Sequence, residues 1–370
     1  FSGLFTTLLT PKTPELIASP YRFEGSADKA RTFFEEGLGR AFGQIRAAQA
    51  VNYPFSVFYA FKQSESDDDE NDAGDTVAST GWETMLEGLL KAGFQVTGTW
   101  PMRSELGNRM IASGTNALAS SIVLVCRPRS ASAPVATRRE LLTSLKRDLP
   151  DALRKLQHGN IAPVDLAQAA IGPGMAVFSR YSKVVESDGS PMRVRTALQL
   201  INQALDEVLD DQENEYDAES RWAIDWFKQY GTGEGPYGVA LTLSTAKDCS
   251  IDRMAEAGIV QARAGKVRLL RREELSDEWD PTTAPRVTVW EVAQRLTRAL
   301  ADAGESGAAA LLAKLPDLAE TARDLAYRLY VTSDRKGWTQ EALAYNGLVV
   351  SWPEISRLAA DPGETAERLL

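Results

Sequence analysis

Two hydrophobic patterns alternate along the first 130 residues. Residues 27–49 have a 3.6-residue period that predicts a helix despite three internal glycines; the positions of this stripe are Ala27, Ala30, Phe33, Phe34, Leu38, Phe42 and Ile45. Residues 53–61, YPFSVFYAF, are apolar on both faces. Such a run is typical of a strand covered on both sides by helices, so we expect a helix followed by a buried strand.

A second helix and two more strands are predicted after an acidic loop, SESDDDENDAGD. Thr80 and Glu83 have the spacing of a capping box, and Gly93 supplies a left-handed stop. The apolar stripe between them consists of Trp82, Met85, Leu86, Leu89 and Leu90. The alternating FQVTGTW, ended by Pro101, and the apolar core of SSIVLVCRPR then predict strands.

This order, strand, helix, strand, loop, strand, is that of the closing half of an open α/β sheet. Its last two strands, joined without a helix, are most simply an antiparallel pair at the edge. Ligands of such sheets gather outside the carboxyl ends of the strands. If the first two strands are parallel, their ends share one rim, formed by Tyr59, Lys62, Gln63, Trp100 and Arg103. An aromatic plate with amides and cations suits a nucleobase on its phosphodiester. The alternative is that Trp82 and Trp100 are hydrophobic filler.

From about residue 137 the pattern becomes helical. Residues 137–157 are basic and amphipathic with an interruption at Pro150, and 161–181 are apolar and punctuated by glycine. A long core-facing helix is marked by Val194, Leu198, Ile201, Leu205 and Leu209. The chain after 286 is amphipathic helix throughout, and packing is its simplest interpretation.

Residues 217–272 predict three helices followed by a hairpin with a tight turn at Ala264–Gly265, the order of a winged helix. Between 251 and 272, six basic residues outnumber two acidic ones. Phosphate contacts need such a patch, and we expect DNA contacts from Arg253, Arg263, Lys266 and Arg268. A winged helix used only for packing, or a basic hairpin without function, remains the alternative.

Composition narrows the function classes. The 370 residues carry a net charge of −10, and their length predicts more than one domain. Two distant cysteines, Cys126 and Cys249, and the single histidine, His158, favour a reducing, cytoplasmic location and make metal chemistry improbable. No apolar run has the roughly 20 residues of a membrane span. The chain starts FSGLFTTLL, without an initiator Met, and is expected to be a piece of a longer protein.

Several blocks resemble a known family. They include LFTTLLTPKTPELIASPYRF, VFYAFKQSE, ASTGWETMLEGLLKAGFQVTGTWPMRSELGNRM, TNALASSIVLVCRPR, APVATRRELL, GNIAPVDLAQAAIGPGMAVFSRYSKVVESDGSPMRVRTAL and DLAYRLY. They look like consecutive parts of the bacterial and archaeal adenine-specific DNA methylases with an N-terminal DUF1156 domain, some of which are found in anti-phage gene clusters. The resemblance runs nearly the whole chain.

The resemblance implies methyl transfer from S-adenosylmethionine to the N6 amine of adenine in double-stranded DNA. Trp100 would stack on the flipped base, Tyr59, Lys62 and Gln63 would line the pocket, and Arg103 and Arg109 would neutralise phosphates. The family's cofactor loop and DPPY motif lie upstream of the matched blocks and are absent here. The catalytic residues are therefore unknown, the cofactor would be bound mainly by upstream residues, and this chain should be inactive alone.

The expected fold is α/β: the distal half of a Rossmann-like, S-adenosylmethionine-dependent methyltransferase sheet, then a mainly helical region with a winged-helix-like module. The expected domains are 1–136 (the sheet), 137–216 (helical), 217–285 (winged-helix-like) and 286–370 (helical). Three functions stay open: part of a DNA methyltransferase in phage defence or restriction-modification, a non-catalytic DNA- or partner-binding module of a defence complex, and a structural scaffold. The partners would be DNA, the N-terminal half of the same protein and other defence subunits.

Overall fold

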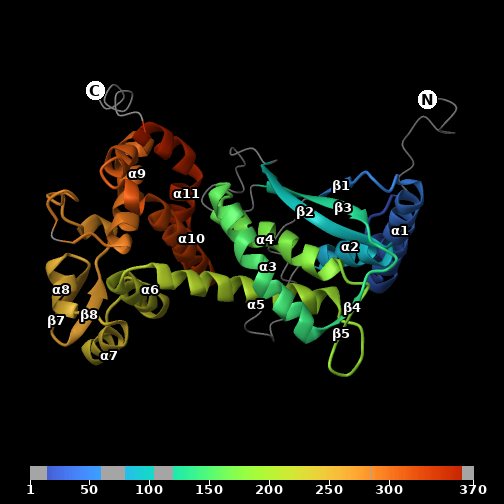
Figure 1. Ribbon diagram of the computed structural model, residues 1–370, viewed down its shortest axis with the longest axis horizontal. Coiled ribbons are helices and arrows are strands. Elements are labelled where there is room, and N and C mark those ends of the chain that lie inside the picture. The colour runs from blue at the N-terminus through green and yellow to red at the C-terminus, as the bar shows by residue number, and fades with distance from the viewer. Residues whose placement is uncertain (1–14, 60–79, 104–119, 285, 361–370) are drawn as a thin grey trace. The chain divides into compact units, whose positions relative to one another are not determined.

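The computed structural model describes residues 15–59, 80–103, 120–284 and 286–360, which form two compact units (Figure 1). Unit 1 draws on the ranges 1–102, 121–148 and 171–201, and unit 2 on 103–120, 149–170 and 202–370. Each unit is thus assembled from separate segments, whereas the domains expected from the sequence were consecutive ranges.

Unit 1 contains a three-stranded sheet with helices. Its elements are η1 (Pro20–Phe23), α1 (Ala27–Ala48), β1 (Phe55–Tyr59), α2 (Thr80–Lys91), β2 (Phe94–Arg103) and β3 (Ser120–Pro128). The strand order is β1-β3-β2, and β1 pairs antiparallel with β3 from Phe55↔Cys126 to Tyr59↔Ile122. The helices predicted around 27–49 and after 80, and the three strands, are confirmed as secondary structure.

Helix α2 buries the predicted stripe and ends as predicted. Trp82, Leu86 and Leu89 are at most 2% exposed, and Gly93 has a φ of 83°. Thr80 is the first residue of α2, and its side chain, on which the predicted capping box depends, lies outside the described residues. The Glu83 carboxylate accepts a hydrogen bond from Arg195 Nε at 2.9 Å.

Three further predictions about local structure are wrong. The strand expected to end at Pro101 continues as β2 to Arg103. β1 is not covered on both faces, since Ser56 and Phe58 alternate outward and Phe58 is 67% exposed. The helix predicted to be interrupted at Pro150 continues through it as α3 (Arg138–His158). A proline inside a helix removes one backbone hydrogen bond, which a well-packed helix survives with a bend.

Helix α4 (Pro163–Ser179) explains the glycine-rich stretch that follows residue 161. In unit 1 its Ser179 hydroxyl accepts a hydrogen bond from the backbone N–H of Val96 in β2 at 2.9 Å. A Cβ at Gly172 would overlap the side chain of Thr99, and one at Gly174 would overlap Ile201 of α5 (Val194–Asp211). These glycines therefore allow close packing. Short strands β4 (Val135–Thr137) and β5 (Lys183–Val185) pair in parallel.

Unit 2 contains a small mixed module, residues 217–272, and a set of long helices. The module consists of α6 (Ala218–Tyr230), β6 (Gly235–Pro236), α7 (Tyr237–Lys247), α8 (Ile251–Glu256), β7 (Val260–Arg263) and β8 (Lys266–Leu269), with strand order β6-β8-β7. The three helices and the hairpin were predicted, and β6 was not.

The long helices are α9 (Val289–Leu312), broken at Gly304, α10 (Ala319–Arg335) and α11 (Thr339–Ala360). Three short 3-10 turns complete the unit: η2 (Gln212–Glu215) lies before α6, η3 (Arg272–Glu274) between β8 and α9, and η4 (Pro316–Leu318) between α9 and α10.

Aromatic side chains of α6 join the module to the long helices. Trp222 and Trp226 stack at 5.0 Å with an interplanar angle of 9°, and the Trp222 indole donates to the backbone oxygen of Ala240 in α7. Phe227 instead meets the ring edges of Trp290, Trp338 and Tyr345. Helix α6 is therefore part of both cores.

Side chains at the start of α6 also cap the N-terminus of α9. Asp217 caps α6 by accepting from Ser220 N–H at 2.8 Å, and its second oxygen accepts from Val289 N–H at 2.9 Å. The Ser220 hydroxyl accepts from Trp290 N–H at 2.8 Å. Two backbone donors at the start of α9 are thereby satisfied by side chains of α6.

No helix in the described ranges is both long and apolar enough to cross a lipid bilayer.

Replacing Trp226 by alanine should lower the free energy of unfolding by about 3–5 kcal/mol, because the indole is fully buried and stacked. Urea denaturation followed by circular dichroism measures this. Leu241→Ala, at a 52% exposed position of α7, is the matched control and should change stability by less than about 1 kcal/mol. Equal destabilisation by both variants would contradict the assigned core.

Candidate nucleic-acid interface

Helix α8 presents a short charged surface. Ser250 caps it by accepting from Arg253 N–H, and Ile251 and Met254 are buried in the module. The remaining positions, Asp252, Arg253 and Glu256, are exposed. The Arg253 side chain makes no ion pair with any residue that the structure describes. One cation and two carboxylates thus face solvent on this helix.

The β7–β8 hairpin places two cations at its tip. Ala264 and Gly265 have φ of 51° and 75°, as a two-residue hairpin turn requires, and Arg263 lies directly opposite Lys266. Like charges opposite one another destabilise a strand pair. Lys266 is compensated by Glu234 at 2.7 Å, and both side chains are more than half exposed. Arg263 is exposed and has no ion pair within the described part of the chain.

Arg268 is held by the protein itself. Its guanidinium donates to both carboxylate oxygens of Glu274, at 2.6 and 2.8 Å, and to Gln261 at 3.0 Å. The hydrogen bonds from Arg268, followed by that from the Arg271 backbone N–H, lower the pKa of Glu274 to about 2. Only 19% of the Arg268 side chain is exposed, so of the four predicted DNA-binding cations it is the least available.

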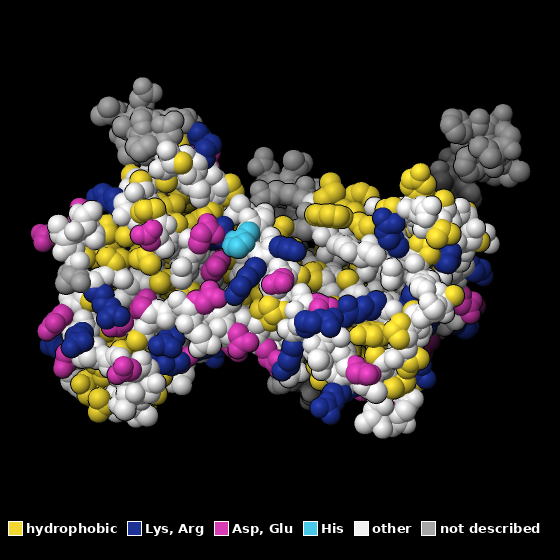
Figure 2. All heavy atoms as spheres, in the orientation of Figure 1, with side chains coloured by type: hydrophobic (Ala, Val, Ile, Leu, Met, Phe, Trp, Pro, Cys, Tyr) yellow, Lys and Arg dark blue, Asp and Glu magenta, His cyan; other side chains and the backbone are white. Residues whose placement is uncertain are grey.

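The basic surplus seen in the sequence is largely neutralised in space. Arg272 turns inward, where it pairs with Glu341, donates to Gln294 and lies 4.8 Å from the ring centre of Tyr345. On the face drawn in Figure 2, basic and acidic side chains are interspersed over the module. The acidic partners Glu234 and Glu274, which sequence reasoning missed, lie outside the window 251–272. Arg271 is a further exposed cation beside this surface.

The predicted nucleobase rim in unit 1 is described only in part. Trp100 lies within β2, three residues before its end, and is 61% exposed, whereas Trp82 is 2% exposed and its ring lies 5.1 Å from that of Tyr59. Trp82 is thus a buried packing residue, as the alternative interpretation had it, whereas Trp100 is largely exposed and is not. Lys62, Gln63 and Arg109 lie outside the described residues, and the side chain of Arg103 is not described.

The cysteines do not form a reactive centre in the described structure. Burial raises the pKa of Cys126 to about 12, and burial also raises the pKa of Cys249. Thiolate is the form that binds metals and attacks electrophiles, so both residues are in their unreactive form near neutral pH.

Comparison with known proteins gives one match. Residues 217–369 match a family model described as a domain of unknown function (DUF8807). The matched region begins at Asp217, the cap of α6. No curated protein and no solved structure matches this chain.

The resemblance to DUF1156-type adenine-specific DNA methylases is therefore wrong. The family model that matches is a different one, and no named relative supports a methyltransferase. Amphipathic and alternating apolar patterns of the kind found in these blocks occur in many folds.

The Arg268–Glu274 pair predicts a pH dependence. Because the pKa of Glu274 is lowered in the folded state, its stabilisation is complete above the ordinary glutamate pKa of about 4.3. It is lost as the pH falls towards about 2. The difference in urea stability between the protein and Glu274→Gln should therefore be largest near pH 6 and shrink on acidification. A difference that does not vary with pH would contradict this.

Proposed function

We propose that residues 217–272 are a winged-helix-like module that binds duplex DNA through its hairpin and α8. The order helix, short strand, two helices and hairpin supports this, with β8 lying between β6 and β7. The observation that carries the proposal is Arg263. It is an exposed cation at a hairpin tip, opposite a second cation, with no acidic partner among the described residues.

The like-charged tip is easier to explain with a polyanion present. Glu234 offsets the charge of Lys266 but not that of Arg263 opposite it, and a phosphate at the tip would give Arg263 a counter-charge. The turn at Ala264–Gly265 is narrow and lacks bulky side chains, so the backbone can approach a groove. Arg253 on α8 supplies a further phosphate contact.

The acidic residues around these cations lower the affinity that we expect for DNA. Glu234 and Glu274 compete with DNA for Lys266 and Arg268, and Asp252 and Glu256 repel phosphates beside Arg253. A module with few free cations makes few phosphate contacts, so we expect moderate affinity with little sequence preference. Tighter or sequence-specific binding would need further surfaces of the full protein or a partner subunit. The proposal includes a cytoplasmic location, where DNA is accessible.

The double variant Arg253→Ala/Arg263→Ala should bind duplex DNA at least about tenfold more weakly than the unchanged protein. The slope of log affinity against log salt should fall by about 2, one unit for each lost phosphate contact. Fluorescence anisotropy with a labelled duplex across a salt series measures both.

Lys336→Ala removes an exposed cation of unit 2 outside the module and is the matched control. Its affinity and salt slope should stay unchanged. If the unchanged protein does not bind at low salt, or if the double variant keeps the full slope, the module serves packing and the proposal fails.

A second candidate function is supported by Trp100. An indole that is 61% exposed on a strand offers a face on which an unpaired base can stack, and Met102, two residues further along β2, is 50% exposed. Methyl transfer from S-adenosylmethionine was implied by the incorrect family resemblance and is not part of this proposal. The candidate is limited to contact with single-stranded nucleic acid.

Trp100→Ala should weaken binding of a single-stranded oligonucleotide by about 1–3 kcal/mol, the usual contribution of one stacked base. Phe58→Ala removes another exposed aromatic side chain of the same sheet, on β1, and is the control. Anisotropy measurements with the same oligonucleotide compare the two. Equal losses, or no loss for Trp100→Ala, would contradict a specific stacking role.

A further inference from the structure

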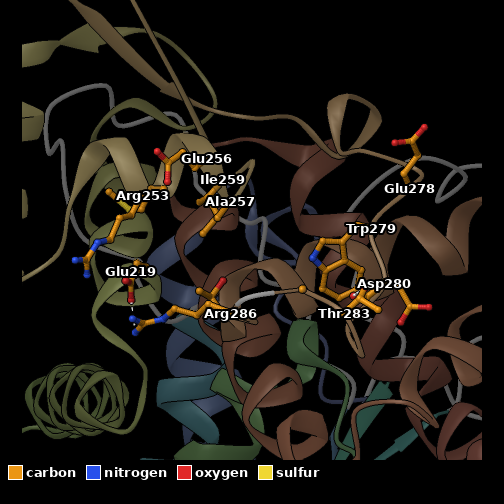
Figure 3. Close-up of a pocket in the computed structure, with 13 residues that line it drawn as sticks. Glu219, Arg253, Glu256, Ala257, Ile259, Glu278, Trp279, Asp280, Thr283 and Arg286 are labelled. Carbon is orange, nitrogen blue, oxygen red and sulfur yellow. Dashed lines mark hydrogen bonds and ion pairs between the residues drawn. The ribbon is translucent and has the colours of Figure 1, made fainter.

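A cavity of about 470 Å³ lies beside the module, between α8 and the segment 278–288. Its volume is in the range of small-ligand sites. Its floor is apolar, formed by Met254 and Ile259, which are at most 1% exposed. Charged side chains and one indole, that of Trp279, form the walls (Figure 3). Arg253 on its wall is also a proposed DNA contact, but the interior of the cavity has no part in that proposal.

The cavity contains a buried carboxylate with an exposed partner. The Glu219 side chain, in the first turn of α6, is 7% exposed, and its Oε2 lies 2.7 Å from Nη2 of Arg286. The Arg286 side chain is 55% exposed and reaches from the 278–288 segment towards Glu219, as Figure 3 shows. A carboxylate withdrawn from water needs a cation or hydrogen-bond donors. The contact with Arg286 therefore shows that a guanidinium group fits beside the Glu219 carboxylate.

The remaining charges favour a cation over an anion. Four carboxylates line the cavity, those of Glu219, Glu256, Glu278 and Asp280, against two guanidinium groups. Asp280 is already bound by Lys314 at 3.2 Å and by Thr282. Glu256 and Glu278 are exposed and have no ion pair among the residues that the structure describes. Arg253 is the lining guanidinium without an ion pair among the described residues, so the unpaired charges are two carboxylates and one cation. Their net negative charge attracts a second cation.

The aromatic wall is fixed in place. The guanidinium of Arg295 lies 4.2 Å from the ring centre of Trp279, and Arg295 also donates to the backbone oxygen of Ser276 at 2.8 Å. Lys314 holds the neighbouring Asp280. A guanidinium has a flat face suited to indole and a planar fork suited to a carboxylate. The cavity thus offers an arginine two kinds of favourable surface on different walls, the buried Glu219 carboxylate and the Trp279 indole.

We propose that this cavity binds an arginine side chain of a partner protein, paired with Glu219 and bordered by Trp279, and that Arg286 occupies the place in the free protein. The partner segment is basic and exposed, because Glu256 and Glu278 at the rim attract flanking cations. Binding displaces Arg286 into solvent, where more than half of its side chain already lies.

The proposal is tested by isothermal titration of the whole chain with a blocked Gly-Arg-Gly peptide. The same peptide with citrulline in place of arginine, which is nearly isosteric but uncharged, is the ligand control. We expect weak binding of the arginine peptide only. Arg286→Ala should strengthen it at least about tenfold, because the internal competitor is removed.

Adding Glu219→Gln to Arg286→Ala should reverse that gain. Glu273→Gln, an exposed acidic position outside the cavity, should have no effect. The rim double variant Glu256→Gln/Glu278→Gln, at two exposed positions, tests the site without altering α6 and should weaken binding several-fold. Failure of Arg286→Ala to bind the arginine peptide at millimolar concentration, equal binding of the citrulline peptide, or insensitivity to both sets of acidic variants would overturn the proposal.

Discussion

The capping of the α9 N-terminus by side chains at the start of α6 is the interaction on which the architecture of residues 217–360 depends. Asp217 and Ser220 satisfy backbone donors of both helices, so neither N-terminus can be withdrawn without exposing or stranding polar groups of the other. The aromatic contacts of Phe227 add apolar packing to the same junction. The small module and the long helices are therefore one cooperative structure, which agrees with a family match that begins at Asp217.

This arrangement fixes which charges are available. Arginines near the junction are used internally: Arg272 joins the module to α11, and Arg295 fixes the wall of the cavity. Further out, Arg263 at the hairpin tip and Arg253 on α8 have no ion pair among the described residues, whereas Lys266 is paired with Glu234. The proposed DNA surface and the proposed arginine receptor thus differ in origin, since the first consists of charges left unpaired and the second of a carboxylate buried early in α6.

The local hydrophobic pattern predicted where helices, strands and turns occur better than it predicted which side chains are exposed or paired. The stripe of α2 and the Ala264–Gly265 turn depend on neighbouring residues and were found from the sequence. The exposure of Trp100 and the neutralisation of Lys266 and Arg268 depend on residues distant in sequence or outside the counted window, and no periodicity reports them. β6 was missed because a strand of two residues is too short to show an alternating hydrophobic pattern. The cavity was missed because Glu219 and Arg286 are 67 residues apart in the sequence. The incorrect family resemblance has a similar origin, since similar patterns were taken for common descent.

The close approach of α4 to β2 carries a consequence for sequence change. Gly172 leaves no room for a methyl group beside Thr99. The close contact between helix and strand therefore depends on two positions that lie far apart in the chain. A larger residue at one of these positions can be accommodated only by a smaller one at the other. Among relatives that keep this contact, positions 99 and 172 should therefore covary, and the glycine should persist wherever a branched side chain stands on the strand.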